Sequence, residues 1–448
     1  MKYNIKNKFL ELTMLSSGLL VMSLIFSSYF MGIGLTAFFV LCLSSCVYFY
    51  KTYAHQHPGI KNHNIYFSNI TSANSLAWLA CFFITGFYVA LYFYDDLLAM
   101  GMPRFLDGWI AMVDPMARFL HGGSADRWFL YGSFYTFAVL VMGFRMILKY
   151  RGNRYQQIRT ISVMFFQLGF SFLIPAFLKR MNQPEFYFTY FWPLKYDYLF
   201  PSGIEWITSS GSLGVFMICW GLVMTFIATP ILSYYFGKRW YCSWVCGCGG
   251  LAETLGDPFR QHSSKSEKAW VVERWMIHSV LVIITLTTIL LWANDSYGGA
   301  FLGEYSQTTK KWYGFYIGAV FSGVIGVGFY PIFGSRVWCR FGCPMAAILG
   351  IFQRTFSRFR ITVNGDQCMS CGNCSTYCEM GIDVRGYAQR GENIVRSSCV
   401  GCGVCSAVCP RGVLKLENGD SHKDRFEGSE NPISTLISSI KTRKIYPS

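Results

Sequence analysis

The residues with the most specific chemistry are eight cysteines near the C-terminal end of the chain. They form two runs of spacing C-x2-C-x2-C-x3-C, and Pro410 follows the second run. Three closely spaced thiolates hold three corners of a [4Fe–4S] cube, and the fourth cysteine of each run ligates the other cube. The spacing predicts cluster 1 at Cys368, Cys371, Cys374 and Cys409, and cluster 2 at Cys399, Cys402, Cys405 and Cys378. Zinc is the alternative, but zinc sites use separated C-x2-C pairs.

A second set of cysteines belongs to an internal repeat. Residues 236–246 (copy 1) reappear as residues 333–343 (copy 2), with Phe, Gly, Arg and both cysteines in register. The two C-x3-C motifs consist of Cys242 and Cys246 in copy 1, and Cys339 and Cys343 in copy 2. Cysteines four residues apart at the start of a helix lie on one side of it. Such pairs can bind copper, form part of an iron–sulfur site, or cycle between dithiol and disulfide.

The composition tells which elements must position these cysteines. The chain has 448 residues, of which 52% are hydrophobic and 14% charged, and this is too apolar for a soluble enzyme. We predict eight membrane spans, at about 11–31, 33–50, 73–94, 127–148, 160–178, 212–236, 275–293 and 312–333. The first apolar run is too long for a signal peptide and continues into the second, so we interpret it as a retained helix.

The predicted fold is an all-α polytopic membrane domain of about eight transmembrane helices, followed by a small α+β module with two clusters. We expect four parts. They are an N-terminal transmembrane region with five helices and outer loops (1–211), a transmembrane region with the duplicated C-x3-C motifs (212–360), a two-cluster ferredoxin module (361–415) and a flexible polar tail (416–448).

The charges between the spans predict an orientation. With the N-terminus in the cytoplasm, the inner loops are basic and the outer ones are mixed or acidic, as the positive-inside rule requires. The net charge of +15 then lies mainly at the cytoplasmic face, next to anionic lipid. We therefore expect a multi-pass protein of the bacterial inner (cytoplasmic) membrane, with the N-terminus and the ferredoxin module both cytoplasmic.

These motifs resemble the membrane polyferredoxins that include NapH, NosR and CcoG. The resemblance covers about residues 212–415 and rests on the double C-x3-C motif, on Cys343-Pro344 and on the two cysteine runs. It implies a conduit that passes electrons between the quinone pool or cytoplasmic donors and respiratory enzymes or their maturation systems. CcoG-type members are linked to copper reduction, so a copper-handling maturation factor that uses the C-x3-C pairs is the alternative function.

The chain departs from that pattern at two places. Copy 1 is followed by Gly247 and an additional Cys248 instead of Pro, so Cys248 is a further candidate ligand of the membrane site. Glu379 follows Cys378 where many ferredoxins have Pro, and we expect this to alter a turn rather than ligation.

Four other charged or polar residues lie in or near the predicted spans. We expect Arg145 to reach the membrane interface and Glu253 to pair with Arg239 or cap a helix. His121 and Asp114 could supply the polar groups of a quinol site, but we prefer an aromatic belt at the membrane surface as the explanation of their surroundings.

The sequence thus predicts a membrane-bound electron-transfer protein with two [4Fe–4S] clusters and a possible further iron–sulfur or copper site at the C-x3-C pairs. The expected partners are membrane lipid, a redox protein such as a flavoprotein or cytochrome, and quinone. No glycine fingerprint for nucleotides and no nucleic-acid platform is found. We expect the chain to be an electron-transfer subunit of a larger oxidoreductase, without catalytic acid–base residues of its own.

Overall fold

The computed structural model describes residues 5–24, 31–54, 73–189, 191–364 and 367–419. Six helical segments are long and apolar enough to cross a membrane: Ile33–Tyr53, Ser75–Tyr92, Arg127–Lys149, Arg154–Arg180, Ser212–Phe236 and Glu267–Ser296. Their outer surfaces carry exposed large apolar side chains, such as Phe82 (78% exposed) and Trp275 (72%). Apolar surface of this extent is typical of contact with lipid. The chain is a multi-pass membrane protein.

Two of the eight predicted spans are not among these six segments of the described residues. The first predicted span (11–31) overlaps α1 (Ile5–Ser23), and its residues 25–30 lie outside the described part of the chain. The eighth (312–333) is divided between α15 (Tyr305–Tyr313), the π-helix η7 (Gly314–Ile325) and the short α16 (Tyr330–Phe333). Lysines at the start of the eighth predicted span lower its hydrophobicity, and glycines along the span shorten the continuous helix. Most of the predicted tail, residues 420–448, lies outside the described residues.

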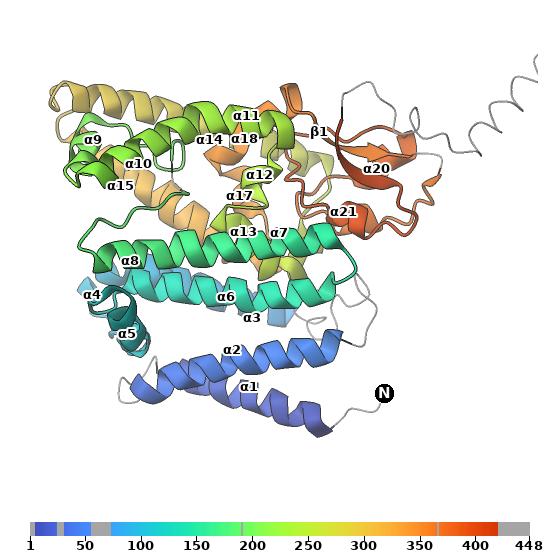
Figure 1. The fold of residues 1–448 in the computed structure, drawn as a ribbon, viewed down its shortest axis with the longest axis horizontal. Coiled ribbons are helices and arrows are strands. Elements are labelled where there is room, and N and C mark those ends of the chain that lie inside the picture. Colours follow the sequence, from blue (N-terminus) through green and yellow to red (C-terminus); the bar gives the residue numbers. More distant parts are fainter. Residues whose placement is uncertain (1–4, 25–30, 55–72, 190, 365–366, 420–448) are drawn as a thin grey trace, which may run out of the picture.

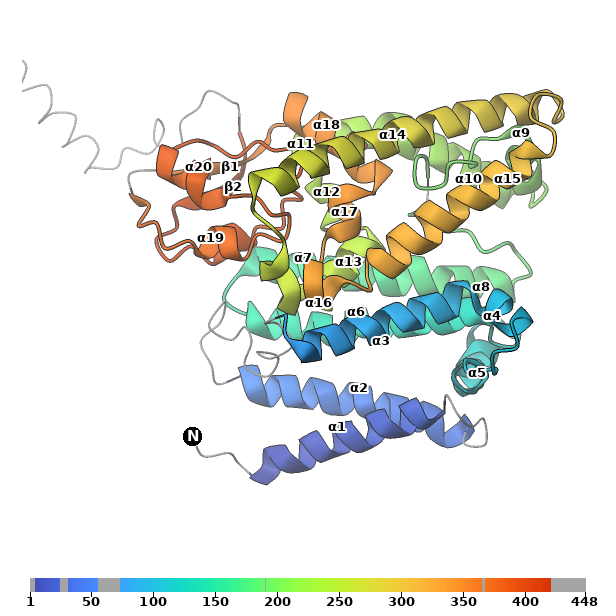
Figure 2. The ribbon, with the colours of Figure 1, turned by 180° about the vertical axis from the view of Figure 1, so that it is seen from behind.

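The N-terminal half forms the lower layers of the body in Figure 1. The helices of these layers are α1, α2 (Met31–Tyr53), α3 (Ser75–Tyr92), α4 (Tyr94–Ala99), α5 (Asp107–His121), α6 (Arg127–Lys149), α7 (Arg154–Phe165), the π-helix η4 (Phe166–Leu173) and α8 (Ile174–Arg180). The next helix, α9 (Pro201–Thr208), lies in the upper layer. The helix α2 packs on α1 and α6, and α6 packs on α7. The N-terminal end of α1 and the ferredoxin module lie at the same end of the body (Figures 1 and 2).

The second half supplies the upper layer and the elements between the layers. Its helices are α10 (Ser212–Val223), the π-helix η5 (Met224–Ala228), α11 (Thr229–Phe236), α12 (Arg239–Cys242), α13 (Gly247–Thr254), the 3-10 helix η6 (Asp257–His262), α14 (Glu267–Ser296), α15, η7, α16, α17 (Val337–Phe341) and α18 (Pro344–Thr355). The short helices α12, α13 and α17 lie between the upper and lower layers (Figures 1 and 2). The repeat cysteines are carried by these short elements and not by the long spans.

The C-terminal module is small and mixed. It contains β1 (Phe359–Val363), α19 (Asn373–Thr376), α20 (Val384–Arg390), α21 (Val404–Ala407) and β2 (Leu414–Asn418). The two strands pair antiparallel with Ile361 opposite Leu416. Gly372 and Gly403 precede α19 and α21 with φ of 79° and 73°, a conformation that glycine adopts without strain. Each therefore turns the chain sharply just after Cys371 or Cys402.

One hydrophobic core joins this module to the cysteine repeat. It includes Cys242 and Cys343 of the repeat together with Phe359, Cys399 and Cys405 of the module, all less than 9% exposed. The module is therefore packed onto the membrane body through shared apolar contacts.

Candidate iron–sulfur centres and adjoining cavity

The eight ferredoxin cysteines gather in two groups of four. Cys368, Cys371, Cys374 and Cys409 line one hollow, where Cys371 is exposed. Cys378, Cys399, Cys402 and Cys405 line a second hollow. Each group combines three cysteines of one run with the fourth of the other, which is the arrangement that a two-cluster ferredoxin requires.

The second group fits an anionic metal cluster in its electrostatics. Burial raises the pKa of Cys402 and Cys405 well above the ordinary thiol range, and that of Cys399 to about 11. Free thiols here would stay protonated at neutral pH, whereas a metal displaces the thiol proton. The backbone N–H of Ile382 also donates to Cys378 Sγ at 3.4 Å, as expected for a thiolate acceptor.

The cluster 2 group faces the membrane body, and the cluster 1 group faces away from it. Gln156 Nε2 on α7 donates to the Cys402 carbonyl at 2.7 Å, and Tyr155 Oη donates to the Gly401 carbonyl at 2.8 Å. Ser243 Oγ, between the two cysteines of copy 1, donates to the Val400 carbonyl at 2.7 Å. Cluster 2 is thus the group next to the repeat.

The two copies of the repeat have the same local structure. Gly237 ends α11 and Gly334 ends α16 with φ of 63° and 90°, and each is followed by a short helix that carries the first cysteine. The second cysteine of each copy is the N-cap of a longer helix, Cys246 for α13 and Cys343 for α18. Helix N-termini favour thiolates, so both positions suit metal ligation.

The cysteines of both copies meet at one place, together with Cys248. All five line a single cavity. The Cys248 thiol donates a hydrogen bond to Cys246, which lowers the pKa of Cys246 to about 7. Burial instead raises the pKa of Cys242 to about 12. Cys248 lies in the protein interior, so its exposed surface faces this cavity and not the outside of the molecule.

The spacing of these thiols bears on the kind of metal. Ligands bound to one zinc or copper ion through bonds of about 2.3 Å lie no more than about 4.6 Å apart. In the described part of the chain, the group of three ligand atoms that all lie within 4.8 Å of one another is Glu253, Glu379 and Cys402. Among the described residues, no three thiols of the repeat form such a group, so three of them would have to move closer together to bind one such ion.

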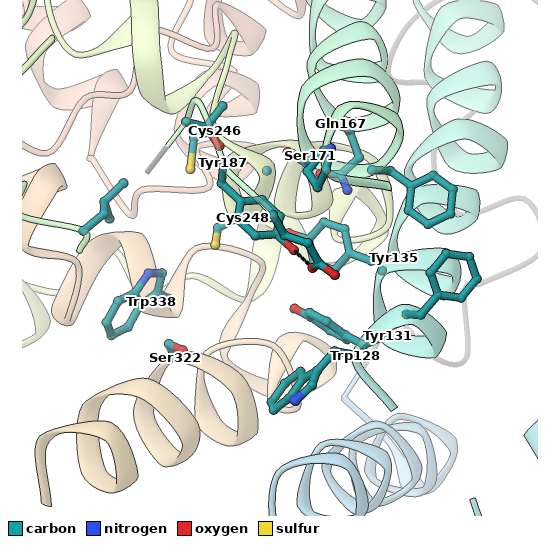
Figure 3. Close-up of a pocket in the computed structure, with 18 of the residues that line it drawn as sticks. Trp128, Tyr131, Tyr135, Gln167, Ser171, Tyr187, Cys246, Cys248, Ser322 and Trp338 are labelled. Carbon is teal, nitrogen blue, oxygen red and sulfur yellow. Dashed lines mark hydrogen bonds between the residues drawn. The ribbon is translucent and has the colours of Figure 1, made fainter. Parts of the chain in front are cut away.

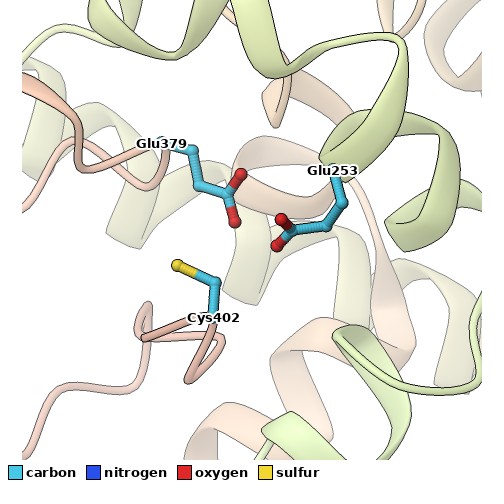
Figure 4. Close-up of side chains that lie close together, drawn as sticks. All are labelled: Glu253, Glu379 and Cys402. Atoms are coloured by element: carbon cyan, nitrogen blue, oxygen red, sulfur yellow. The ribbon is translucent and has the colours of Figure 1, made fainter. Parts of the chain in front are cut away.

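Glu253 and Glu379 belong to a buried ion-pair network beside Cys402 (Figure 4). Arg260 and Arg336 each contact both carboxylates, at 2.5–3.0 Å. Because arginines already occupy the carboxylate oxygens, we interpret the group as a network that joins three segments and not as a cation site. Those segments are α13 after copy 1, the arginine of copy 2, and the module.

Two sequence-based expectations are wrong here, and the role of a third residue was not predicted. Glu253 pairs with Arg159, Arg260 and Arg336 instead of Arg239. Arg145 is fully buried against Asp257 at 2.9 Å and does not reach the interface. Glu379 does more than alter a turn, since its carboxylate ties the module to the body. Sequence reasoning missed this network because its members are separated by up to about two hundred residues, and local spacing carries no signal for such pairs.

The network carries an excess of positive charge. Its members are no more than 3% exposed: the cations are Arg145, Lys149, Arg159, Arg260 and Arg336, and the carboxylates are Asp257, Glu253 and Glu379. Five cations thus face three carboxylates. Uncompensated buried charge costs several kcal/mol per ion. Arg336 Nη1 lies 3.7 Å from Cys339 Sγ, so anionic clusters held by the neighbouring thiolates would supply the missing negative charge.

The cavity at the repeat has a volume of about 600 Å³ and extends between the helix layers. Figure 3 shows Cys248, Tyr131 and Ser322 around a common space, with Trp128 and Trp338 at its sides. Tyr135 and Gln167 also line it. Asp126, Lys179 and Glu185 lie at its opposite end, where Lys179 Nζ pairs with Glu185 at 2.8 Å. Local spacing carries little signal for this cavity, because its lining comes from several distant helices.

Comparisons with known proteins match the cysteine-bearing segments. A family model described as a 4Fe-4S dicluster domain matches residues 360–410. A second model, described as a 4Fe-4S binding domain, matches twice, at residues 218–266 and 316–364. These two matches coincide with the two copies of the repeat. No solved structure matches the chain significantly.

Three relatives share about a third of the chain. YccM of Escherichia coli (strain K12), which is named as a proposed electron transport protein, is 27% identical over 36% of the chain and 46% of its own length. An uncharacterized protein, MJ0749, of Methanocaldococcus jannaschii is 28% identical over 36% of the chain and 59% of its own length. The regulatory protein NosR of Stutzerimonas stutzeri is 26% identical over 36% of the chain and 22% of its own length.

The matched segments cover less than two thirds of each of these relatives, so the resemblance concerns the cysteine-bearing part of the chain. In that part, the two cysteine runs, the duplicated C-x3-C motif and the membrane helices agree with the family models. The chain is a membrane-spanning protein with 4Fe-4S ferredoxin domains, related to NosR and YccM in the polyferredoxin family.

Proposed function

We propose that this chain relays electrons between a redox partner on the ferredoxin side and a carrier in the membrane. The relay consists of two [4Fe–4S] clusters in the module and a third cluster held by Cys242, Cys246, Cys339 and Cys343. Clusters of this type accept and release single electrons when bound. The residues of the chain hold these centres in order, exclude water from the inner two and leave the outer one accessible.

The observation that carries this proposal is the order of contacts along one helical segment, Arg154–Arg180. Gln156 contacts the Cys402 carbonyl. Ser162 Oγ donates to the carbonyl of Trp244, between the cysteines of copy 1, at 3.0 Å. Gln167 then lies against Gly247 at the cavity. At 1.5 Å rise per residue, Gln156 and Ser162 are about 9 Å apart along the helix axis, and Ser162 and Gln167 are about 8 Å apart. Cluster 2, the repeat and the cavity thus follow one another in a line.

The outer end of the relay is the natural place for a protein partner. Cys371 and Met369, which is 57% exposed, lie at the cluster 1 hollow on the side away from the membrane body. We propose that a flavoprotein or cytochrome docks here, and that this face and the N-terminus are cytoplasmic in a bacterial inner membrane. The basic inner loops support that orientation.

Copper handling is the competing function, because soft thiolates favour Cu(I). One feature favours the cluster instead, because both copies of the repeat match a family model described as a 4Fe-4S binding domain. The matched variants Cys242→Ser and Cys339→Ser separate the two functions, since each removes one repeat ligand and leaves the module intact.

The test is a reductive titration of anaerobically purified protein, followed by electron paramagnetic resonance. We expect a third reducible centre that is absent from both variants, while the two module centres stay reducible. Stoichiometric copper binding that disappears in the same variants, with no third centre in the unaltered protein, would contradict the proposal and favour the copper function.

A further inference from the structure

The cavity beside Cys248 has the features of a ligand site, because it extends from the repeat cysteines at its inner end to His121, Lys179 and Glu185, where no cysteine motif lies. Its volume of about 600 Å³ lies in the usual range for sites of small organic molecules. Its lining combines Trp128 and Trp338 with the hydroxyl group of Tyr135, whereas the hydroxyl of Ser322 donates to the Gly318 carbonyl. Aromatic faces suit a planar ring, and a hydroxyl donor suits an oxygen acceptor on that ring.

A buried histidine provides a second, independent indication of a ligand. His121 lines the cavity and is 6% exposed. Its Nδ1 accepts a hydrogen bond from the backbone N–H of Gly123 at 3.2 Å, so in the neutral ring the proton is on Nε2. Burial lowers the pKa of His121, which favours this neutral form. Nε2 has no hydrogen-bond partner among the described residues, which leaves a donor for a ligand oxygen. Asp114, by contrast, is taken by Arg118 at 2.6 Å.

The cavity opens at the end of the body opposite the ferredoxin module. Gln156 at the start of α7 touches the module, whereas Lys179 at the end of α8 lies at the mouth with Glu185. From the mouth, Asp126 to Tyr135 along α6 corresponds to a depth of about 14 Å at 1.5 Å per residue. The charged residues are at the mouth, and the thiols are at the inner end.

We propose that this cavity binds an uncharged quinone-type ring next to Cys248 and admits it from the membrane face opposite the ferredoxin module. The ring would exchange two electrons with one-electron centres of the chain and two protons with water at the mouth, so that quinone and hydroquinone interconvert. This exchange rests on the proposed function. The binding of the ring and the side from which it enters do not depend on the proposed function.

Binding is tested with duroquinone and two variants of the same helical segment. Ser171 lines the cavity, so Ser171→Trp fills it. Gly169 is the matched control, because a Cβ at this position meets nothing within 4 Å, and Gly169→Trp therefore adds the same bulk outside the cavity. The iron content of both variants checks that they fold and load clusters.

Two measurements follow binding without relying on electron transfer. One is the rate at which N-ethylmaleimide alkylates Cys248, determined by peptide mass spectrometry, and the other is the midpoint of thermal unfolding. By mass action, we expect about tenfold slower alkylation at a duroquinone concentration about ten times that of half-saturation, with a parallel rise of the midpoint. Both effects should persist in Gly169→Trp and disappear in Ser171→Trp. Equal effects in the two variants, or no saturable effect on either measurement in the unaltered protein, would overturn the proposal.

The side of entry is tested in vesicles sorted by whether a tag after Ser448 faces out or in. Methanethiosulfonate ethylsulfonate, which does not cross membranes, is added outside. We expect Cys248 to react when the tag faces in. Reaction only when the tag faces out would overturn the proposed direction.

If the clusters are absent but duroquinone binds, the proposed function fails while the site stands. If the clusters are intact but duroquinone does not bind, the proposed site fails while the proposed function stands.

Discussion

Copy 1 and copy 2 of the repeat share a backbone but differ in what surrounds their cysteines. In both, a glycine with positive φ turns the chain, and the second cysteine is the N-cap of a helix. After this cysteine, copy 1 continues with Gly247-Cys248 and copy 2 with Pro344-Met345. The shared backbone presents similar ligands at one cavity, whereas the differing residues give copy 1 an additional thiol there and copy 2 the side chain of Met345.

The equivalent arginines show the same division. Arg336 of copy 2 is buried between Glu253 and Glu379, at 2.7 and 3.0 Å. Arg239 of copy 1 lies 4.6 Å from the ring of Phe359 and bonds Asn418 at 2.9 Å. One duplicated residue has thus become part of the internal ion-pair network and the other part of the surface contact with the module. Duplication supplied two similar ligand sets, and divergence gave them different neighbours.

The largest expected effect comes from the arginines. Removing one partner of a buried ion pair costs about 3–5 kcal/mol, so Arg336→Ala should destabilise the protein by this amount. Arg239→Ala should cost about 1 kcal/mol or less, because its contacts are a cation–π interaction and a partly exposed hydrogen bond. Chemical unfolding in detergent, followed by the loss of cluster absorbance, measures both. Equal losses of stability in the two variants would contradict the difference that the contacts of the two arginines predict.

The glycines of the two copies should differ less. A Cβ at position 334 would lie 2.8 Å from the backbone nitrogen of Ser263, whereas at position 237 its near neighbours are side-chain atoms of Gln353 and Phe359. Both substitutions to Ala force a positive φ on a residue with a side chain, at about 1–3 kcal/mol. We expect Gly334→Ala at the upper end of this range and Gly237→Ala at the lower end, in the same unfolding experiment. The reverse order would contradict the packing difference.

The smallest effect concerns the residue after the first cysteine. Ser243 in copy 1 donates to the Val400 carbonyl, and its equivalent Arg340 pairs with Glu273 at 2.6 Å. Ser243→Ala loses one hydrogen bond, worth about 1 kcal/mol. Hydrogen exchange of residues 399–405 should increase while that of α14 stays unchanged. Increased exchange at α14 alone would show that Ser243 does not hold the module.

The sequence predicted what local spacing encodes. Regular spacing was enough to group the cysteines and to find the repeat, and long apolar runs were enough to predict the six spans found among the described residues. The eighth predicted span was wrong in extent, because the apolar pattern does not distinguish a π-helix that ends at Ile325 from a continuous helix to residue 333. The network of Glu253 and Glu379 and the cavity depend on contacts between distant segments. Such contacts follow from packing, which a single sequence does not display.

The most direct test of the account is the iron and acid-labile sulfide content of anaerobically purified protein, compared with three variants. Three [4Fe–4S] clusters predict about twelve irons per chain, and Cys242→Ser and Cys339→Ser should each lose about four. Cys248→Ser should lose none, because the four repeat cysteines already complete the ligand set of a [4Fe–4S] cluster. About eight irons in the unaltered protein, unchanged in all three variants, would contradict a cluster at the repeat cysteines.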